Sequence, residues 1–153
     1  IPGGRALKAV IPGGLSTPPL TSDQMDTPMD FESLVEAGSA LGTGAVIVLD
    51  ETTCMVDVAL RAARFFAHES CGRCTPCRVG SRRAVEILER IEAGRGTPAD
   101  LVLLESLCKG IAGNTFCPLG DAIVSAVGGI LRRFRPEFEQ HIAEGRCALA
   151  RAA

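Results

Sequence analysis

The spacing of apolar residues divides the chain into two parts with different patterns. From residue 54 onward, apolar side chains recur at intervals of three and four, which is typical of amphipathic helices. Residues 1–53 instead hold short extended stretches separated by proline and glycine, as in the repeated Pro-Gly-Gly. The clearest stretches are residues 6–11 and residues 45–49, whose β-branched run predicts a buried strand. We therefore expect an α+β fold.

Five helices are predicted in the second part. The first, within residues 55–70, presents one apolar face formed by Val58, Ala62, Phe65 and Phe66. The second, within residues 81–94, turns a similar face inward, formed by Ala84, Leu88 and Ile91. Together with three further helices, these predict a small helical bundle.

The starts of the three later helices are predicted from capping chemistry. Thr97 is a suitable N-cap for the third, because proline follows at the first turn and Asp100 lies near the positive end of the dipole. Pro118 stands at the start of the fourth helix, and Pro136 at the start of a fifth that ends near Glu144.

Composition narrows the classes of function. The chain has 153 residues, of which 46% are hydrophobic, and 16 Lys and Arg against 18 Asp and Glu. This balance argues against nucleic-acid binding, and the apolar runs are too short for a membrane span. The start of the chain lacks a basic leader followed by an apolar stretch, so a secretion signal is not expected. It begins with Ile rather than Met, which suggests a processed or incomplete sequence.

Three of the seven cysteines lie close together in the segment SCGRCTPCRVG. Cys71, Cys74 and Cys77 have the C-x2-C-x2-C spacing that in a loop directs three thiolates at one iron–sulfur cluster. An odd number of cysteines without a secretion signal favours metal binding in a reducing compartment over a disulfide framework. A fourth ligand would come from the remaining cysteines: Cys54, Cys108, Cys117 and Cys147.

Cys117 is the strongest candidate for that fourth ligand. It follows Asn114 in the segment NTFCPLGD and precedes a predicted helix, where backbone N–H groups favour a thiolate. Its distance from Cys77, 117 − 77 = 40 positions, suits two helices that lead away and return. Cys108 is interpreted as a buried thiol of the third helix. Cys54 and Cys147 are interpreted as structural or incidental.

Zinc is the competing occupant of these four thiols. Structural zinc sites usually contain paired C-x2-C knuckles, whereas here three ligands share one run and the fourth is solitary, so the spacing favours a [4Fe-4S] cluster. Arg73 and Arg78 in the run, and His68 before it, would place positive charge near a cluster and raise its potential. In the alternative interpretation, these residues have no role at the cluster. His68 would then make a local hydrogen bond at its helix end, and the two arginines would form ion pairs at the surface.

The segments ESCGRCTPCRVG, LERIEAGRG, TFCPLGDA and RRFRPEFEQHI, in this order, resemble the C-terminal part of the NADH-binding flavoprotein of bacterial respiratory complex I, its F subunit. Diaphorase subunits of NAD-dependent formate dehydrogenases and hydrogenases share this part. LKAVIPGGLSTP and GTGAVIVLDETTCMVDVA resemble the ubiquitin-like, or β-grasp, domain of the same family. The resemblance implies a partial β-grasp (SLBB-like) domain at residues 1–53 and a helical 4Fe-4S domain at residues 54–153.

The resemblance also implies a function. It makes Cys71, Cys74, Cys77 and Cys117 the ligands of a [4Fe-4S] cluster that receives electrons from FMN and NADH. The family's FMN and NAD(H) site belongs to a flavin domain that these residues do not contain, so hydride transfer would need a missing domain or a partner chain. Because Pro118, Leu119 and Gly120 directly follow Cys117, we expect these residues to face that domain.

The implied partners are a thioredoxin-like 2Fe-2S subunit and a large iron–sulfur or catalytic subunit. The implied location is the cytoplasm, as a peripheral part of a complex at the inner membrane. A soluble diaphorase and a zinc-stabilised interaction module remain the alternatives.

Overall fold

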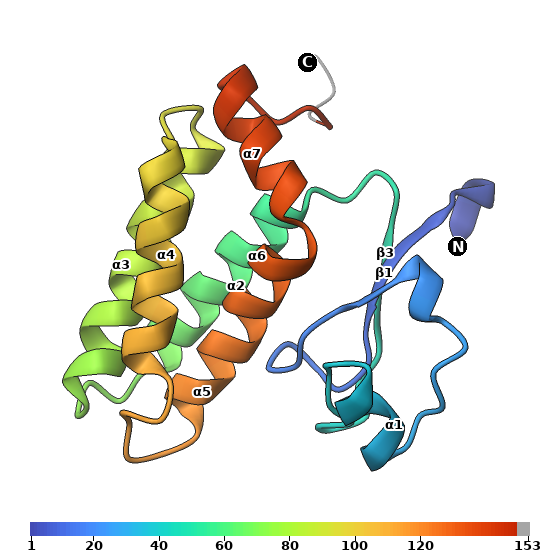
Figure 1. Ribbon diagram of the computed structural model, residues 1–153, viewed down its shortest axis with the longest axis horizontal. Coiled ribbons are helices and arrows are strands. Elements are labelled where there is room, and N and C mark those ends of the chain that lie inside the picture. Colours follow the sequence, from blue (N-terminus) through green and yellow to red (C-terminus); the bar gives the residue numbers. More distant parts are fainter. Residues whose placement is uncertain (150–153) are drawn as a thin grey trace. The chain divides into compact units, whose positions relative to one another are not determined.

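The structure, a computed structural model, describes residues 1–149 and combines helices with a small sheet (Figure 1). The chain divides into two compact units, the first formed by residues 1–53 and the second beginning at Cys54. The sheet lies in the first unit, and the long helices lie in the second. The expected mixture of helix and strand is therefore confirmed.

The first unit is built on a three-stranded antiparallel sheet in the order β2-β1-β3. The strands are β1 (Leu7–Ile11), β2 (Leu20–Thr21) and β3 (Ile47–Asp50). The unit also contains helix α1 (Phe31–Glu36) and the short 3-10 turns η1 (Pro2–Gly4) and η2 (Ser22–Gln24). Asp30 caps α1 by accepting a hydrogen bond from the Ser33 N–H.

The sheet has one buried face and one exposed edge. Ala9 and Ile11 of β1 are buried, as the two-residue period of a strand requires. The prediction of a buried strand at residues 45–49 was wrong in its burial, because Val46 and Val48 are more than half exposed. The β-branched run does form β3, but β3 is an edge strand that pairs with β1 alone.

The second unit consists of helices connected by short loops (Figure 1). They are α2 (Met55–Glu69), α3 (Thr75–Glu92), α4 (Pro98–Ile111), α5 (Leu119–Ile123), η3 (Val124–Gly128), α6 (Gly129–Arg133) and α7 (Arg135–Glu144). The backbone stays right-handed helical from α5 through α6, so these form one helix whose middle turn, η3, is a π-helix. Helices α2 and α3 pack together, and α4 packs along α3.

The helix starts match the capping signals. Thr97 caps α4 in a capping box with Asp100, and proline follows in the first turn. Helices α5 and α7 begin next to Pro118 and Pro136, as expected. One predicted core position was wrong: Phe65 is 48% exposed, although Phe66 beside it is buried.

Apolar side chains from all the main helices meet in the core of the second unit. Fully buried members include Met55, Val56, Leu88, Ile91, Leu104, Ile130 and Phe138.

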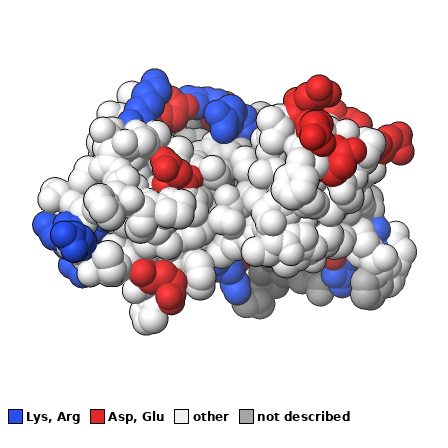
Figure 2. Space-filling model, turned by 90° about the horizontal axis from the view of Figure 1, so that it is seen from below, with Lys and Arg blue, Asp and Glu red and all other residues white. Residues whose placement is uncertain are grey.

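The face of the molecule in Figure 2 carries both acidic and basic groups with uncharged surface between them. None of the helices in residues 1–149 is both long enough and apolar enough to cross a membrane.

Candidate iron–sulfur site

The cysteine run connects α2 to α3. Cys71 is exposed in the connecting loop, Cys74 is the N-cap of α3, and Cys77 lies buried in the first turn of α3. The expectation that all three cysteines lie in an irregular loop was therefore wrong for Cys77. Helix α3 begins inside the run because Pro76 is favourable in a first helical turn.

Local hydrogen bonds hold the loop in shape. Gly72 has φ +81°, a left-handed conformation that glycine adopts without steric cost. The Arg78 guanidinium donates to the Gly72 carbonyl oxygen at 2.6 Å and so closes the loop onto α3. Ser70 Oγ lies 3.4 Å from Cys77 Sγ and accepts a bond from the Gly72 N–H. Before Cys74 the run is thus a loop without regular secondary structure, and its conformation is held by these hydrogen bonds.

The second cysteine loop follows α4. The Thr115 hydroxyl donates to the Cys117 carbonyl oxygen at 2.9 Å, and the Gly113 N–H donates to Asp121 Oδ1 at 2.8 Å. Cys117 is exposed and stands directly before Pro118, the N-cap residue of α5. A thiolate there would be close to the free N–H groups at the start of the helix.

One hydrogen bond joins the two cysteine loops. The Phe116 N–H donates to Cys74 Sγ at 3.3 Å, across 42 positions of sequence. Helix α3 leads away from the first loop and α4 returns to it, as the 40-residue spacing predicted. The structure therefore places the loop of Cys117 beside the loop of Cys74.

The donor set fits an iron–sulfur cluster. All four residues are free cysteines, and an amide N–H already points at one sulfur, as is common around cluster sulfurs. Four sulfurs on one tetrahedral zinc would lie about 3.8 Å apart. In residues 1–149, three or more possible ligand atoms lie within 4.8 Å of one another only in a different group, Cys54, His141 and Cys147. The four cysteines are therefore spaced more widely than a single zinc ion requires.

Arg73 and His68 make different contacts near the run. The Arg73 guanidinium lies 6.0 Å from the centre of the Phe116 ring, which is 91% exposed. His68 is exposed, and its Nδ1 lies 2.9 Å from Glu69 Oε1, so it makes a local pair at the end of α2. The interpretation of His68 as a histidine satisfied at its helix end fits this pair.

The expected docking residues differ in exposure. Pro118 is exposed and Leu119 is half-buried, so both are accessible. Gly120 is buried, and a Cβ there would meet the Thr115 side chain at 2.4 Å. Gly120 therefore allows α5 to pack closely against the loop at Thr115, and it does not offer a surface to a partner.

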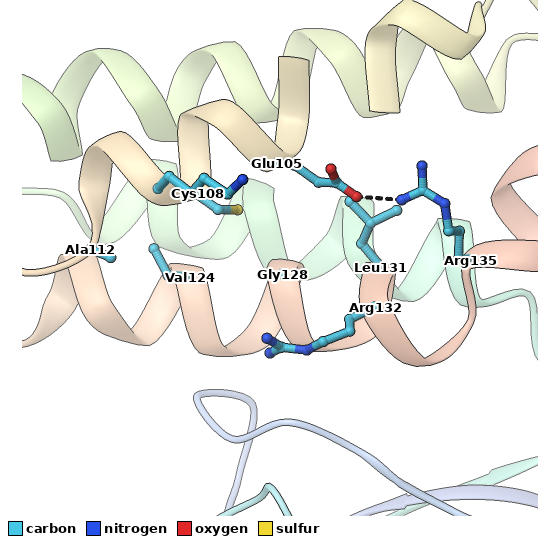
Figure 3. A pocket seen from close by; sticks show the side chains of 9 residues that line it. Glu105, Cys108, Ala112, Val124, Gly128, Leu131, Arg132 and Arg135 are labelled. Atoms are coloured by element: carbon cyan, nitrogen blue, oxygen red, sulfur yellow. Dashed lines mark hydrogen bonds and ion pairs between the residues drawn. The ribbon is translucent and has the colours of Figure 1, made fainter. Parts of the chain in front are cut away.

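Cys108 lies apart from both loops. It is half-buried on α4 and lines a cavity of about 350 Å³ with Arg132, Arg135 and Glu105 among its other lining residues (Figure 3). Burial raises the pKa of the Cys108 thiol to about 11, while Arg132 opposes this shift and Glu105 adds to it. This agrees with its interpretation as a buried thiol of the third helix.

Sequence reasoning missed one group of possible ligands. Cys54, at the N-cap of α2, His141 in α7 and Cys147 beyond α7 bring their ligand atoms within 4.8 Å of one another. The spacing of His141 and Cys147, six positions, was visible in the sequence. The 87 positions between Cys54 and His141 hid the third member.

Comparison with known proteins places this geometry in a family. Residues 57–141 match the family described as "NADH-ubiquinone oxidoreductase-F iron-sulfur binding region". This range is more than half of the chain and contains both cysteine loops.

Relatives match over almost the whole chain. The second NADH-quinone oxidoreductase F subunit of Rhizobium meliloti is 54% identical over 144 residues, which are 94% of this chain and 34% of that protein. The NADH-quinone oxidoreductase F subunit of Streptomyces coelicolor is 46% identical over 94% of this chain and 32% of that protein. The chain thus spans about a third of the length of these relatives.

A solved structure shares the fold. The crystal structure of NAD+-reducing [NiFe]-hydrogenase in the H2-reduced state matches with a TM-score of 0.81 and 32% identity. The match covers 90% of this chain and 24% of the hydrogenase chain.

Proposed function

Because the chain belongs to the family of NADH-ubiquinone oxidoreductase-F iron–sulfur binding regions, we propose that it transfers electrons through a [4Fe-4S] cluster. The proposed ligands are Cys71, Cys74, Cys77 and Cys117. The observation that carries this assignment is the hydrogen bond from the Phe116 N–H to Cys74 Sγ, because it brings the solitary cysteine's loop to the cysteine run. When bound, the cluster supplies one-electron transfer.

The residues around the run have separate tasks in this proposal. The Phe116 N–H would donate to the sulfur of Cys74, and the Ser70 hydroxyl would donate to the sulfur of Cys77. Hydrogen bonds to cluster sulfurs raise the reduction potential of the cluster. Arg78 fixes the loop shape through Gly72. Arg73 adds positive charge at the surface, which favours the more negative reduced state.

The electrons would come from NADH by way of FMN. The relatives are named as parts of NADH-quinone oxidoreductases, and NADH releases electrons in pairs as hydride. A flavin between NADH and a one-electron carrier resolves this mismatch. FMN and NAD(H) would be bound outside these 153 residues, in another domain or on a partner chain, so this chain alone would not perform hydride transfer.

We assign each of the two units to a separate domain. We assign residues 1–53 to a partial β-grasp (SLBB-like) domain, supported by the antiparallel sheet and its small helix α1. Residues 54–153 would be a helical bundle that binds the 4Fe-4S cluster, since both cysteine loops lie there.

The names of the relatives support a proposal for the wider assembly. We propose a peripheral place at the cytoplasmic face of the inner membrane, in a complex I-type NADH:quinone oxidoreductase. The neighbours would be a thioredoxin-like 2Fe-2S subunit and a large iron–sulfur subunit. The match to a hydrogenase that reduces NAD+ supports a second candidate, the diaphorase subunit of a soluble hydrogenase or formate dehydrogenase.

Anaerobic purification tests the cluster assignment. The chain is expected to be brown, to contain about four irons and to lose colour on reduction with dithionite. Cys117→Ser should lose most of the iron, whereas Cys108→Ser, a matched change of a half-buried cysteine outside the run, should keep it.

Two results would overturn the assignment. A colourless chain whose cysteine run holds one zinc ion would favour the alternative of a zinc-stabilised interaction module. A brown chain whose iron content survives Cys117→Ser would show that the fourth ligand is another residue.

A further inference from the structure

A second group of cysteines lies at the other end of α2 and α3. Cys54 Sγ is 3.9 Å from His141 Nε2, and Cys147 Sγ lies within 4.8 Å of both atoms. His141 is 3% exposed, and both cysteines are half-buried. Cys54 and the neighbouring pair His141 and Cys147, which are distant from it in sequence, therefore direct a nitrogen and two sulfurs at one point.

Glu92, the last residue of α3, directs an oxygen at His141, although it lies outside the group of three ligand atoms within 4.8 Å of one another. Its Oε2 lies 3.3 Å from His141 Nε2. This oxygen is buried and makes no hydrogen bond with proper geometry, and it is the one such side-chain atom found in the described part of the chain. Buried polar oxygens are nearly always bonded, so a missing partner needs an explanation.

Two distances from His141 are close to those in the ligand shell of one tetrahedral ion. Nitrogen and oxygen ligands at about 2.1 Å from zinc lie about 3.4 Å apart, and a sulfur and a nitrogen lie about 3.6 Å apart. The separations of His141 from Glu92 and from Cys54 are close to these values.

Burial keeps the Cys54 thiol protonated at ordinary pH when no metal is bound. It raises the pKa of Cys54 to about 12; the Asp57 N–H opposes this shift, while Cys147 and Glu92 add to it. A divalent cation would lower this pKa, because a coordinated thiol releases its proton to solvent and ligates as a thiolate.

We propose that Cys54, His141 and Cys147 bind one zinc ion and that the Glu92 carboxylate, 3.3 Å from His141 Nε2, takes the fourth position when the ion binds. Thiolate and imidazole ligands in a tetrahedral arrangement are typical of zinc. This site does not depend on the proposed electron-transfer function, and its residues are distinct from the four cysteines of the cluster.

The position of the site suggests a structural role. Cys54 begins α2 and Glu92 ends α3, whereas the cysteine run lies at the other end of both helices. Fifteen residues of helix α2 separate the two sites by about 20 Å, so the zinc lies outside the ligand shell of the cluster. It would tie the ends of α2 and α3 to α7 and to the segment after it.

Metal analysis of the anaerobically purified chain tests the proposal. The wild type should contain about one zinc per chain in addition to iron. Cys147→Ser should lose the zinc and keep the iron, and the fold should tolerate this change because Cys147 lies outside any helix. Cys108→Ser, the matched control, should keep both. Cys117→Ser should lose iron and keep zinc, which separates this site from the cluster.

Cobalt provides a spectroscopic readout. Added to zinc-free wild type that retains its iron, Co2+ should give the intense thiolate-to-metal absorption of a tetrahedral site, and Cys54→Ser or Cys147→Ser should abolish it. Glu92→Gln should weaken zinc binding by about tenfold or more. Wild type that holds no zinc and gives no thiolate–cobalt absorption would overturn the proposal, as would zinc retained by the double variant of Cys54 and Cys147. An unchanged affinity in Glu92→Gln would remove Glu92 from the ligand set.

Discussion

The backbone N–H of Phe116 donates a hydrogen bond to Cys74 Sγ at 3.3 Å. The donor belongs to the residue before Cys117, and the acceptor is the middle cysteine of the run. The contact therefore both aligns the two loops and places a dipole on a proposed cluster ligand. A donor on a ligand sulfur stabilises the reduced state more than the oxidised state, because the reduced cluster carries more negative charge.

Removing this donor should lower the potential of the cluster. In Phe116→Pro the backbone nitrogen carries no hydrogen. If the hydrogen bond favours the reduced state by about 1 kcal/mol, its loss lowers a one-electron potential by roughly 40 mV. A redox titration followed by electron paramagnetic resonance measures this shift.

Phe116→Ala is the matched control for this prediction. It keeps the N–H but removes the ring that Arg73 approaches at 6.0 Å. Its potential should remain within about 15 mV of the wild-type value, since an exposed cation–π contact is worth only about 0.5–1 kcal/mol and is retained in both redox states. Equal shifts in the two variants would assign the effect to the ring and contradict the role of the N–H.

Much of the helical unit could be predicted because its signals are local. Thr97 and Asp100 form a capping box within four residues, and Pro118 and Pro136 mark helix starts wherever the helices later pack. The approach of the Cys117 loop to the run could also be predicted, since two helices that lead away and return bring their outer ends together.

The remaining features depend on packing across long separations. Phe65 has the right period for the core, yet it is exposed and meets the Phe66 ring edge-on at 5.2 Å. Strand β2 has only two residues, too few for any periodic signal. The contact of Cys54 with His141 depends on how α7 packs against α2, which no local pattern encodes.

Alanine at Gly94 should destabilise the second unit strongly. Gly94 has φ +70°, and a Cβ there would lie 1.9 Å from the Gly145 carbonyl oxygen. Left-handed backbone costs a non-glycine residue about 1–2 kcal/mol, and the backbone clash adds to this, so we expect a loss of at least about 2 kcal/mol. Thermal unfolding should show a melting temperature lower by roughly 5 °C or more.

The matched control for Gly94 is Gly110→Ala in α4. Gly110 is exposed within a helix, and a Cβ there meets nothing within 4 Å. This variant should gain about 0.5–1 kcal/mol from helix propensity. A Gly94→Ala variant as stable as the wild type would contradict the close approach of α3 to the end of α7.

The Cys108 thiol should be unreactive at ordinary pH. With a pKa of about 11 it is about one part in a thousand thiolate at pH 8, and the thiolate is the reactive form. Alkylation by iodoacetamide, followed by peptide mass spectrometry, should be roughly a hundredfold slower than that of glutathione at this pH. The rate should rise about tenfold for each pH unit up to pH 10. A rate that is flat with pH would show that access, and not ionisation, limits the reaction.

Neutralising Asp100 should remove a pH-dependent contribution to stability. Asp100 is 6% exposed and accepts hydrogen bonds from the Arg90 guanidinium and from the N–H and hydroxyl of Thr97. Burial alone would raise the pKa of Asp100, but these bonds outweigh it and hold the pKa below its usual value. Asp100→Asn should therefore cost about 1–2 kcal/mol at pH 7, a value that allows for the partial exposure of Arg90.

The pH dependence of this cost has a definite sign. A carboxylate whose pKa is lower in the folded chain contributes fully above its unfolded pKa, about 3.9, and the contribution disappears as the pH falls through the folded value. The difference in free energy of unfolding between wild type and Asp100→Asn, measured by urea denaturation, should thus stay constant from pH 7 to 5 and decrease below about pH 4. Asp57→Asn, which removes an exposed i,i+4 pair with Arg61, should change stability by less than about 0.5 kcal/mol throughout. A difference that persists unchanged at pH 3 would mean that the carboxyl contributes by packing and capping, without its charge.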